Sequence, residues 1–122
     1  MSTDEAFQRV RLERPGLVIL KQVPHVTEAS TNRLFQRAEE LLSDASPRTL
    51  VVDLRETRIP DAPNRALLRR RISDLSLNRF IVVVGGNRLI QVAARFVVST
   101  IGIDDTRACQ TLEEALEVSS EV

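Results

Sequence analysis

Three closely spaced carboxylates are the first candidates for chemistry. Asp53, Glu56 and Asp61 follow an apolar run and precede a stretch with helical spacing. Two carboxylates can work as general acid and base, and ligands of open α/β sheets bind at the carboxyl ends of strands. The favoured alternative is structural, because Asp is a common N-cap residue: Asp61 would cap a helix, and Asp53 would bind nearby backbone at the end of a strand.

The other reactive side chains form no catalytic or metal-binding pattern. Cys109 is the single cysteine and His25 the single histidine, so an internal disulfide is impossible and no metal-ligand spacing is present. We expect Cys109 to be a small buried residue of an edge strand. No combination of nucleophile, base and electrophile appears, so neither a catalytic residue nor a metal or cofactor is predicted.

A glycine pair marks a junction that could hold an anion. Gly85, Gly86 and Asn87 stand between a predicted strand and a predicted helix, and backbone N–H groups at such a junction can bind phosphate. The stretch lacks both G-x-G-x-x-G and the Gly-Lys-Ser/Thr of a phosphate-binding loop. A tight turn followed by an Asn87 cap is therefore favoured.

Composition narrows the function classes. The 122 residues have the usual size of one domain, residues 1–122. Lys plus Arg and Asp plus Glu number 17 each, so the basic excess of a nucleic-acid binder is missing. No apolar run approaches the roughly 20 residues that span a bilayer, and residues 1–14 do not resemble a signal peptide. With a lone cysteine, this predicts a cytoplasmic protein without a transmembrane segment.

Alternating strand-like and helix-like segments must position these residues, and such alternation is typical of an α/β fold. The predicted strands are 7–12, 17–23, 49–54, 80–84 and, at an edge, 106–110. The predicted helices are 27–45, 61–75, 87–101 and 111–116. The first two strands form a hairpin across Pro15-Gly16. The expected fold is a mixed sheet of four or five strands with helices mainly on one side, in the order ββαβαβα(β)α.

Arginines crowd the second predicted helix. At about 100° per residue, its buried face consists of Leu67, Leu68, Ile72 and Leu75. Arg65, Arg69 and Arg70 are predicted on the opposite side, as a solvated or partner-facing patch. Arg71 falls at the edge of the apolar arc, where it must extend its head group to solvent or find an acidic partner.

The predicted helix 87–101 is unusually apolar. Its polar residues form one narrow stripe of Arg88, Gln91, Arg95 and Ser99. The remaining arc spans on the order of 240°, more than one sheet face can bury. Either neighbouring segments cover the excess, or it forms a dimer seam or a pocket for an apolar ligand. Val92, Phe96 and Ile101 are the candidate residues for such an interface or pocket.

Two stretches resemble a known family. Residues 51–68 (VVDLRETRIPDAPNRALL) look like the third strand, connecting loop and following helix of the STAS family, the bacterial anti-sigma factor antagonists. Residues 111–116 (TLEEAL) resemble the usual STAS ending, and the element order resembles the STAS fold. In that family the loop typically reads Asp-Ser-Ser/Thr-Gly, and phosphorylation of a hydroxyl there switches partner binding off.

The departures from the STAS pattern lie in that loop. Asp61 is followed by Ala62, Pro63 and Asn64, and neither Ala nor Pro can accept a phosphoryl group. The resemblance therefore implies a divergent member without the phosphorylatable Ser, closer to the SpoIIAA-like proteins, which share the fold and generally lack the phosphoserine motif. Some comparisons place that group near the CRAL-TRIO lipid-transfer proteins.

The sequence thus predicts a non-enzymatic, regulatory protein-binding module. Its expected partner is a regulatory kinase, an anti-sigma-like protein or a scaffold, and a homodimer is also expected. The candidate contact residues are Asp61, Ala62, Pro63, Asn64, Arg65 and Arg69. The alternative is a small apolar-ligand or lipid-binding protein that uses the helix 87–101, and an enzyme is the least favoured class.

Overall fold

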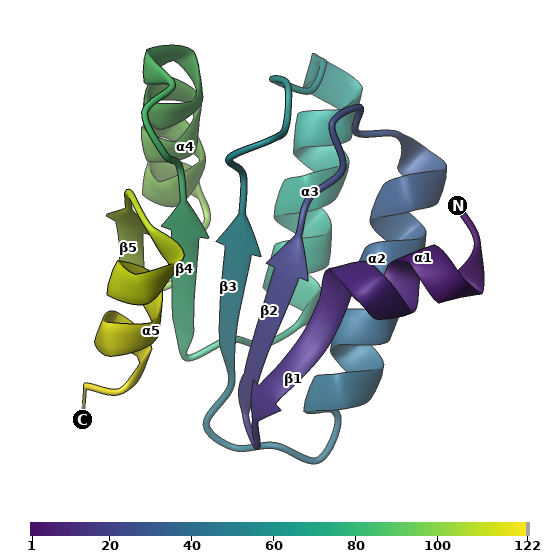
Figure 1. Ribbon diagram of the computed structural model, residues 1–122, viewed down its shortest axis with the longest axis vertical. Helices are drawn as coiled ribbons and strands as arrows, with labels where there is room; N and C mark the ends of the chain where they lie inside the picture. Colours follow the sequence, from purple (N-terminus) through teal and green to yellow (C-terminus); the bar gives the residue numbers. More distant parts are fainter. Residues whose placement is uncertain (122) are drawn as a thin grey trace.

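A five-stranded sheet in the order β1-β2-β3-β4-β5 organises the chain in the computed structural model, which describes residues 1–121 (Figure 1). The strands are β1 (Val10–Arg14), β2 (Leu17–Lys21), β3 (Thr49–Asp53), β4 (Arg79–Val83) and β5 (Asp105–Cys109). The helices are α1 (Thr3–Arg9), α2 (Glu28–Leu42), α3 (Ala62–Asp74), α4 (Arg88–Thr100) and α5 (Leu112–Ser119). β1 is antiparallel to β2, and every other pair is parallel. The predicted α/β class and mixed sheet are confirmed.

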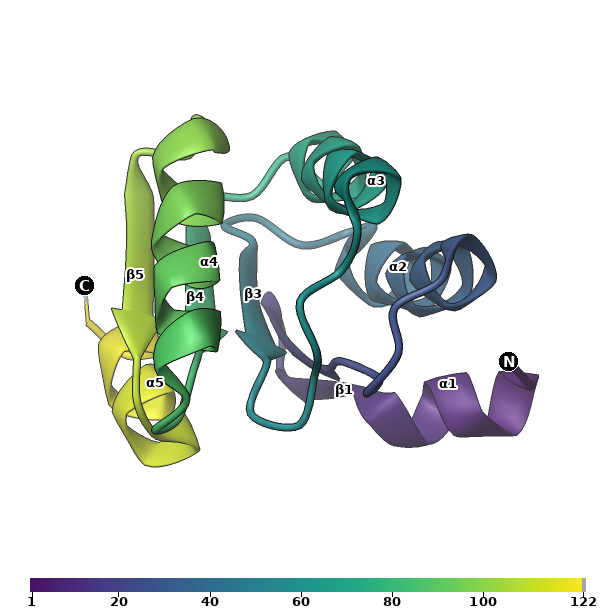
Figure 2. The same cartoon turned by 90° about the horizontal axis from the view of Figure 1, so that it is seen from above.

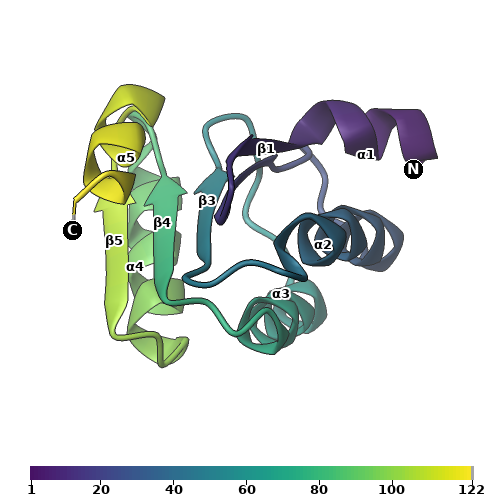
Figure 3. The ribbon, with the colours of Figure 1, turned by 90° about the horizontal axis from the view of Figure 1, so that it is seen from below.

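The chain winds across the sheet in one direction. Each of the three crossovers through α2, α3 and α4 adds the next strand on the same side of the previous one. Because such crossovers are right-handed, all three helices lie on one face of the sheet (Figure 2). α5 packs on the other face, over β4 and β5 (Figure 3). On their shared face, α2, α3 and α4 therefore form a row, and α4 lies at its end.

The apolar runs of the central strands are explained by burial on both faces. The face under α2, α3 and α4 carries Val18, Leu20, Leu50, Val52, Phe80 and Val82. The opposite face carries Leu17, Ile19, Val51, Ile81 and Val83, which pack with Ala115 of α5. Burial on both faces therefore accounts for the apolar runs of β3 and β4.

The predicted strand 7–12 is wrong in its first half, because α1 extends to Arg9 and β1 begins only at Val10. Ser2 caps α1, its Oγ accepting a hydrogen bond from the Glu5 N–H at 3.2 Å. Ala6 and Val10, four residues apart, are both buried, a spacing that a helical turn satisfies. Phe7 remains exposed beneath the guanidinium of Arg37 of α2, 4.1 Å from its ring centre.

All four predicted helix starts are confirmed by their caps. The side chains of Thr27, Asp61, Asn87 and Thr111 each accept a backbone N–H from the first turn of α2, α3, α4 and α5. α5 runs to Ser119, past the predicted end at Leu116.

The hairpin turn is also confirmed. Gly16 has φ +86°, and a Cβ there would stand 2.6 Å from the Pro47 carbonyl oxygen. Among residues 1–121, no helix is both long and apolar enough to cross a bilayer.

Candidate functional site

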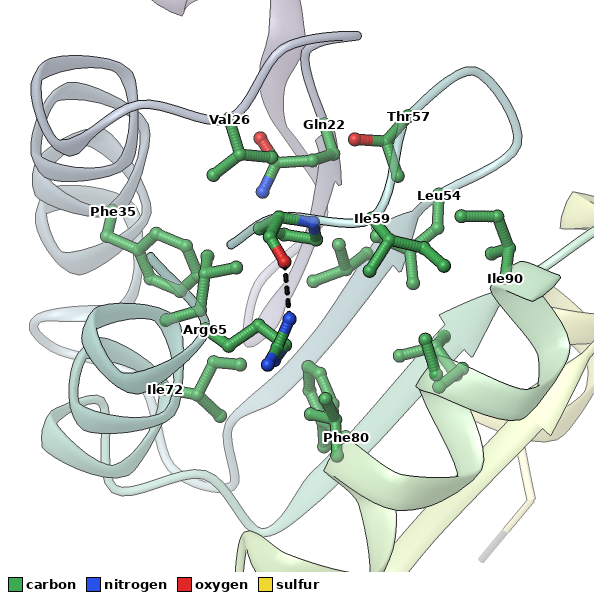
Figure 4. A pocket seen from close by; sticks show the side chains of 17 residues that line it. Gln22, Val26, Phe35, Leu54, Thr57, Ile59, Arg65, Ile72, Phe80 and Ile90 are labelled. Carbon is green, nitrogen blue, oxygen red and sulfur yellow. Dashed lines mark hydrogen bonds between the residues drawn. The ribbon is translucent and has the colours of Figure 1, made fainter. Parts of the chain in front are cut away.

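A pocket of about 80 Å³ opens between α3 and α4 on the helical face of the sheet (Figure 4). Its floor is formed by Val52, Phe80 and Val82 of β3 and β4. Its walls are Leu68 and Ile72 of α3 and Ile90, Ala93, Ala94 and Val97 of α4. The loop from β3 to α3 covers it with Leu54, Thr57, Ile59 and Pro60. This loop is the segment that resembles the STAS switch loop, so the pocket lies beneath it.

Three polar side chains interrupt the apolar lining: Gln22, Thr57 and Arg65. The Thr57 hydroxyl is satisfied, because it donates to the Val23 carbonyl oxygen at 2.7 Å. Gln22 is only 2% exposed, and its Oε1 accepts from the Val23 N–H at 3.0 Å. No acceptor for the Gln22 amide N–H groups is found within residues 1–121, and Figure 4 shows this nitrogen pointing from the end of β2 toward the cavity.

Arg65 lies at the pocket, which corrects its predicted place on the solvated side of α3. It is half-buried, and its Nη1 donates to the Pro60 carbonyl oxygen at 2.6 Å (Figure 4). The physical reason is its spacing: Arg65, Leu68 and Ile72 stand at i, i+3 and i+7 and therefore share one helix face. Arg70, which was predicted on the same side of the helix as Arg65, is exposed.

The remaining candidate contact residues stay near the start of α3. Asp61, Ala62 and Pro63 are exposed, whereas Asn64 and Arg69 are half-buried. Asp61 is a cap, with its Oδ1 accepting from the Asn64 N–H at 3.0 Å. Nothing among these contacts gives Asp61 a chemical role beyond capping.

Arg71 turns toward α2 rather than toward an acidic group. Its Nη2 donates to the Asn32 carbonyl oxygen at 3.3 Å, and no carboxylate in the described part of the chain pairs with it. Its Nε is buried without a described partner. The aliphatic stem therefore packs between α2 and α3 while one end of the head group binds backbone.

α4 has two faces with different surroundings. Ile90 and Ala94 are buried in the core, whereas Leu89, Val92 and Phe96 are 68%, 65% and 60% exposed. We call these three exposed residues the α4 stripe. Of the two alternatives for the apolar arc, complete coverage by neighbouring segments does not hold.

Ile101 does not belong to this stripe. It is 8% exposed and part of the core, so the predicted grouping of Ile101 with Val92 and Phe96 is corrected. The pocket uses the opposite flank of α4, through Ile90 and Val97. The reason is angular: Ile101 stands about 180° from Val92 around the helix, at about 100° per residue.

Two arginines border the α4 stripe. Arg88 and Arg95 are exposed, and no described carboxylate lies within ion-pair distance of either. α4 itself contains no Asp or Glu. Gln91, the other polar residue near the stripe, binds within the protein: its Nε2 donates to the Gly85 carbonyl oxygen at 2.9 Å. The exposed surface of α4 is thus apolar with an unpaired positive margin.

The carboxylates after β3 do not form an acid–base pair. Asp53 is buried and binds Arg55 through two contacts, Nε to Oδ1 at 2.9 Å and Nη2 to Oδ2 at 2.8 Å. Burial alone raises the pKa of Asp53, but hydrogen bonds from the Arg55 side chain and backbone, with the charges of Arg55 and Lys21, outweigh it and hold that pKa below its ordinary 3.8. Glu56 pairs at the surface with Lys21 at 3.3 Å.

Cys109 is buried near the end of β5, as predicted. Burial raises the pKa of its thiol, the charge of Glu114 adds to this, and Arg107 partly offsets it. His25 is exposed, with its Nε2 3.2 Å from Arg58 Nη1. Within the described residues, no group of three or more His, Cys, Asp and Glu side chains could hold a metal ion.

The glycine junction is a turn. Gly85 adopts φ +65°, which suits a residue without Cβ, and the Asn87 side chain accepts from the backbone N–H groups of Leu89 and Ile90. Those first-turn donors are the ones an anion would need. The tight-turn interpretation therefore fits the geometry.

A second and wider depression of about 530 Å³ lies at the other end of the strands. Two of its arginines are already engaged: Arg79 Nε lies 2.7 Å from Asp105 Oδ2, and Arg14 Nη2 donates to the Ser119 carbonyl oxygen at 2.6 Å. The α3–α4 pocket differs, because no described carboxylate pairs with its one charged side chain, Arg65.

The geometry of α3, α4 and the loop between β3 and α3 supplies the argument for function. No protein-family model matches the sequence, and no curated protein matches it either. The STAS resemblance consequently remains a resemblance, and the α4 stripe and the α3–α4 pocket are the two candidate sites of this α/β domain.

Proposed function

We propose that this protein is a non-enzymatic protein-binding module that docks its partner on the α4 stripe. The observation that carries the proposal is the exposure of Leu89, Val92 and Phe96 on one helix face. Contiguous exposed apolar surface is a mark of interaction sites. The resemblance to a STAS module without the phosphorylatable hydroxyl supports a constitutive binder, and the order of elements from β1 onward agrees with it.

The docking surface extends from the stripe toward α3. Ala93, half-buried, lies between the stripe and the pocket on the helix circumference. Ile59, 44% exposed, belongs to the loop that covers the pocket. Asp61, Ala62 and Pro63 continue the exposed surface at the start of α3. We assign the contact surface to this band.

The partner is a protein segment that presents an apolar ridge edged by carboxylates. Arg88 and Arg95 border the stripe without a described ion-pair partner, and charge complementarity steers and orders docking. A homodimer built on two α4 helices would bring four arginines together with no acidic residue on either helix. The charge pattern therefore favours a different, acidic chain over a second copy.

The test compares two exposed apolar sites. The double variant Val92→Ser/Phe96→Ser removes two of the three stripe residues, and Leu12→Ser removes another exposed apolar side chain, 45% exposed, at the opposite edge of the sheet. We expect a protein recovered by the wild type from native lysate to bind the purified stripe variant at least about tenfold more weakly. Calorimetry measures the affinity, and circular dichroism checks that both variants are folded.

Arg88→Gln/Arg95→Gln adds a readout of charge. This variant should weaken binding and reduce its dependence on salt, because exposed charge pairs are screened by salt. Equal affinity for wild type and stripe variant, or equal loss in Leu12→Ser, would show that α4 is not the docking surface. Binding to anionic vesicles with no protein partner would also overturn the proposal.

A further inference from the structure

We propose that the pocket between α3 and α4 binds a small aliphatic carboxylate, with its head group on Arg65 and Gln22 and its chain among the apolar side chains below. This ligand site adjoins the proposed docking surface, which shares Ile59 and Ala93 with it, but none of the three stripe residues lines the pocket. It rests on two polar groups from different elements whose donors are unused.

Arg65 supplies the positive charge. Its guanidinium has five N–H donors, and one donates to the Pro60 carbonyl oxygen at 2.6 Å. No described carboxylate lies within ion-pair distance of it, although the side chain is half-buried among apolar neighbours. A half-buried cation is stabilised by an anion, and the planar guanidinium matches a carboxylate in a two-bond geometry.

Gln22 supplies a second, neutral donor. Its side chain is 2% exposed and its Oε1 already accepts from the Val23 N–H. The amide nitrogen faces the pocket without an acceptor among residues 1–121 (Figure 4). The nitrogen is therefore free to donate to a ligand in the pocket that also binds Arg65.

The rest of the lining selects the body of the ligand. Apart from Gln22, Arg65 and the satisfied Thr57, every lining side chain is apolar, so a sugar or nucleotide would leave its own polar groups unpaired. A single guanidinium suits the one charge of a carboxylate. The volume of about 80 Å³ is roughly half that of an engineered apolar cavity that holds benzene. The chain is therefore short, a straight or branched group of a few carbons.

The probe is isovalerate, followed by two-dimensional ¹H–¹⁵N NMR of the full chain. We expect shifts at the amides of Gln22, Ile59, Arg65 and Ala93. Two matched compounds separate the contributions: 3-methylbutan-1-ol keeps the branched chain without the charge, and acetate keeps the charge without the chain. Both should bind at least about tenfold more weakly, because charged hydrogen bonds and buried methylenes each contribute on that scale.

Two variants test the head group. Arg65→Met keeps an apolar stem and removes the charge, whereas Gln22→Glu keeps the acceptor for Val23 and replaces the amide donor with a carboxylate. Each should weaken isovalerate binding by about tenfold or more. Arg70→Met, on the exposed side of α3, is the matched control and should bind as the wild type does.

Several outcomes would overturn the proposal. They are the absence of shifts around the pocket with isovalerate, equal binding of the alcohol, or unchanged affinity in both Arg65→Met and Gln22→Glu. The comparison of the three compounds uses the wild type alone, so it tests the ligand-site proposal even if a variant fails to fold. The stripe variant Val92→Ser/Phe96→Ser should retain isovalerate binding, so a failure of either proposal leaves the other measurable.

Discussion

At the residue scale, Asp53 shows how a carboxylate at a strand end serves the fold. It is buried, and Arg55 closes over it with two side-chain contacts and a backbone N–H. Gly85 lies under the same arginine, where a Cβ would stand 3.2 Å from Arg55 Cγ. The Asp53–Arg55 ion pair therefore connects the end of β3 with the turn after β4.

We predict that Asp53→Asn lowers the free energy of unfolding by about 1–3 kcal/mol at neutral pH. The lower end is expected because the Arg55 side chain is 43% exposed and solvent screens the pair. The pKa of Asp53 is lower in the folded state than its ordinary 3.8, so its stabilisation is present above that value and is lost as pH falls through the folded pKa.

Urea denaturation at about pH 7 and about pH 2.5 measures this difference. The gap between wild type and Asp53→Asn should narrow at the lower pH. Glu56→Gln, which removes an exposed surface pair with Lys21, should change stability by less than about 0.5 kcal/mol at either pH. A gap of the same size at both pH values would contradict the ionic role of Asp53.

At the element scale, α4 carries two adjacent residues in opposite environments. Ile90 is 4% exposed and Leu89 is 68% exposed. We predict that Ile90→Ala lowers the free energy of unfolding by about 2–5 kcal/mol, because it removes buried methylenes and leaves a cavity. Leu89→Ala should stay within about 0.5 kcal/mol of the wild type.

The two substitutions are matched in helix and neighbourhood, so thermal or chemical denaturation of both gives the comparison directly. A large loss of stability in Leu89→Ala would mean that another part of the protein covers the stripe. That result would remove the main support for docking on α4.

At the scale of the whole molecule, Arg48 links the ends of two helices. Its guanidinium donates to the carbonyl oxygens of Ser43 and Ala45, at 3.0 and 3.1 Å, and of Leu75, at 2.9 Å. The first two carbonyls follow α2, and Leu75 is the C-cap of α3. A positive charge is favourable at the C-terminal ends of helices, where carbonyl groups lack partners.

We predict that Arg48→Lys lowers the free energy of unfolding by about 1–3 kcal/mol, because an ammonium group cannot reach three carbonyls with the fork of a guanidinium. Arg70→Lys, at an exposed site on α3, is the control and should be neutral within about 0.5 kcal/mol. Equal stability of Arg48→Lys and wild type in denaturant would show that water replaces these bonds without cost.

The sequence by itself determined the features that depend on near neighbours in the chain. Caps at Thr27, Asp61, Asn87 and Thr111 could be predicted because each needs only a backbone N–H two or three residues ahead. The hairpin followed from Pro15-Gly16, and the central strands followed from continuous apolar runs. α1 was missed because Val10 and Leu12 alternate with Arg11 as in a strand, whereas Phe7 and Val10 are three residues apart, which is a helical spacing.

Only the tertiary structure decided which surfaces are covered. The one-directional winding places α4 at the end of the row of helices (Figure 2). No helix of residues 1–121 therefore lies beyond the stripe, although its residues are as apolar as those of the core. Gln22, directly after β2, and Arg65 of α3 likewise line one pocket although they are distant in the chain. Burial and convergence depend on segments distant in the chain, whereas periodicity and capping are local.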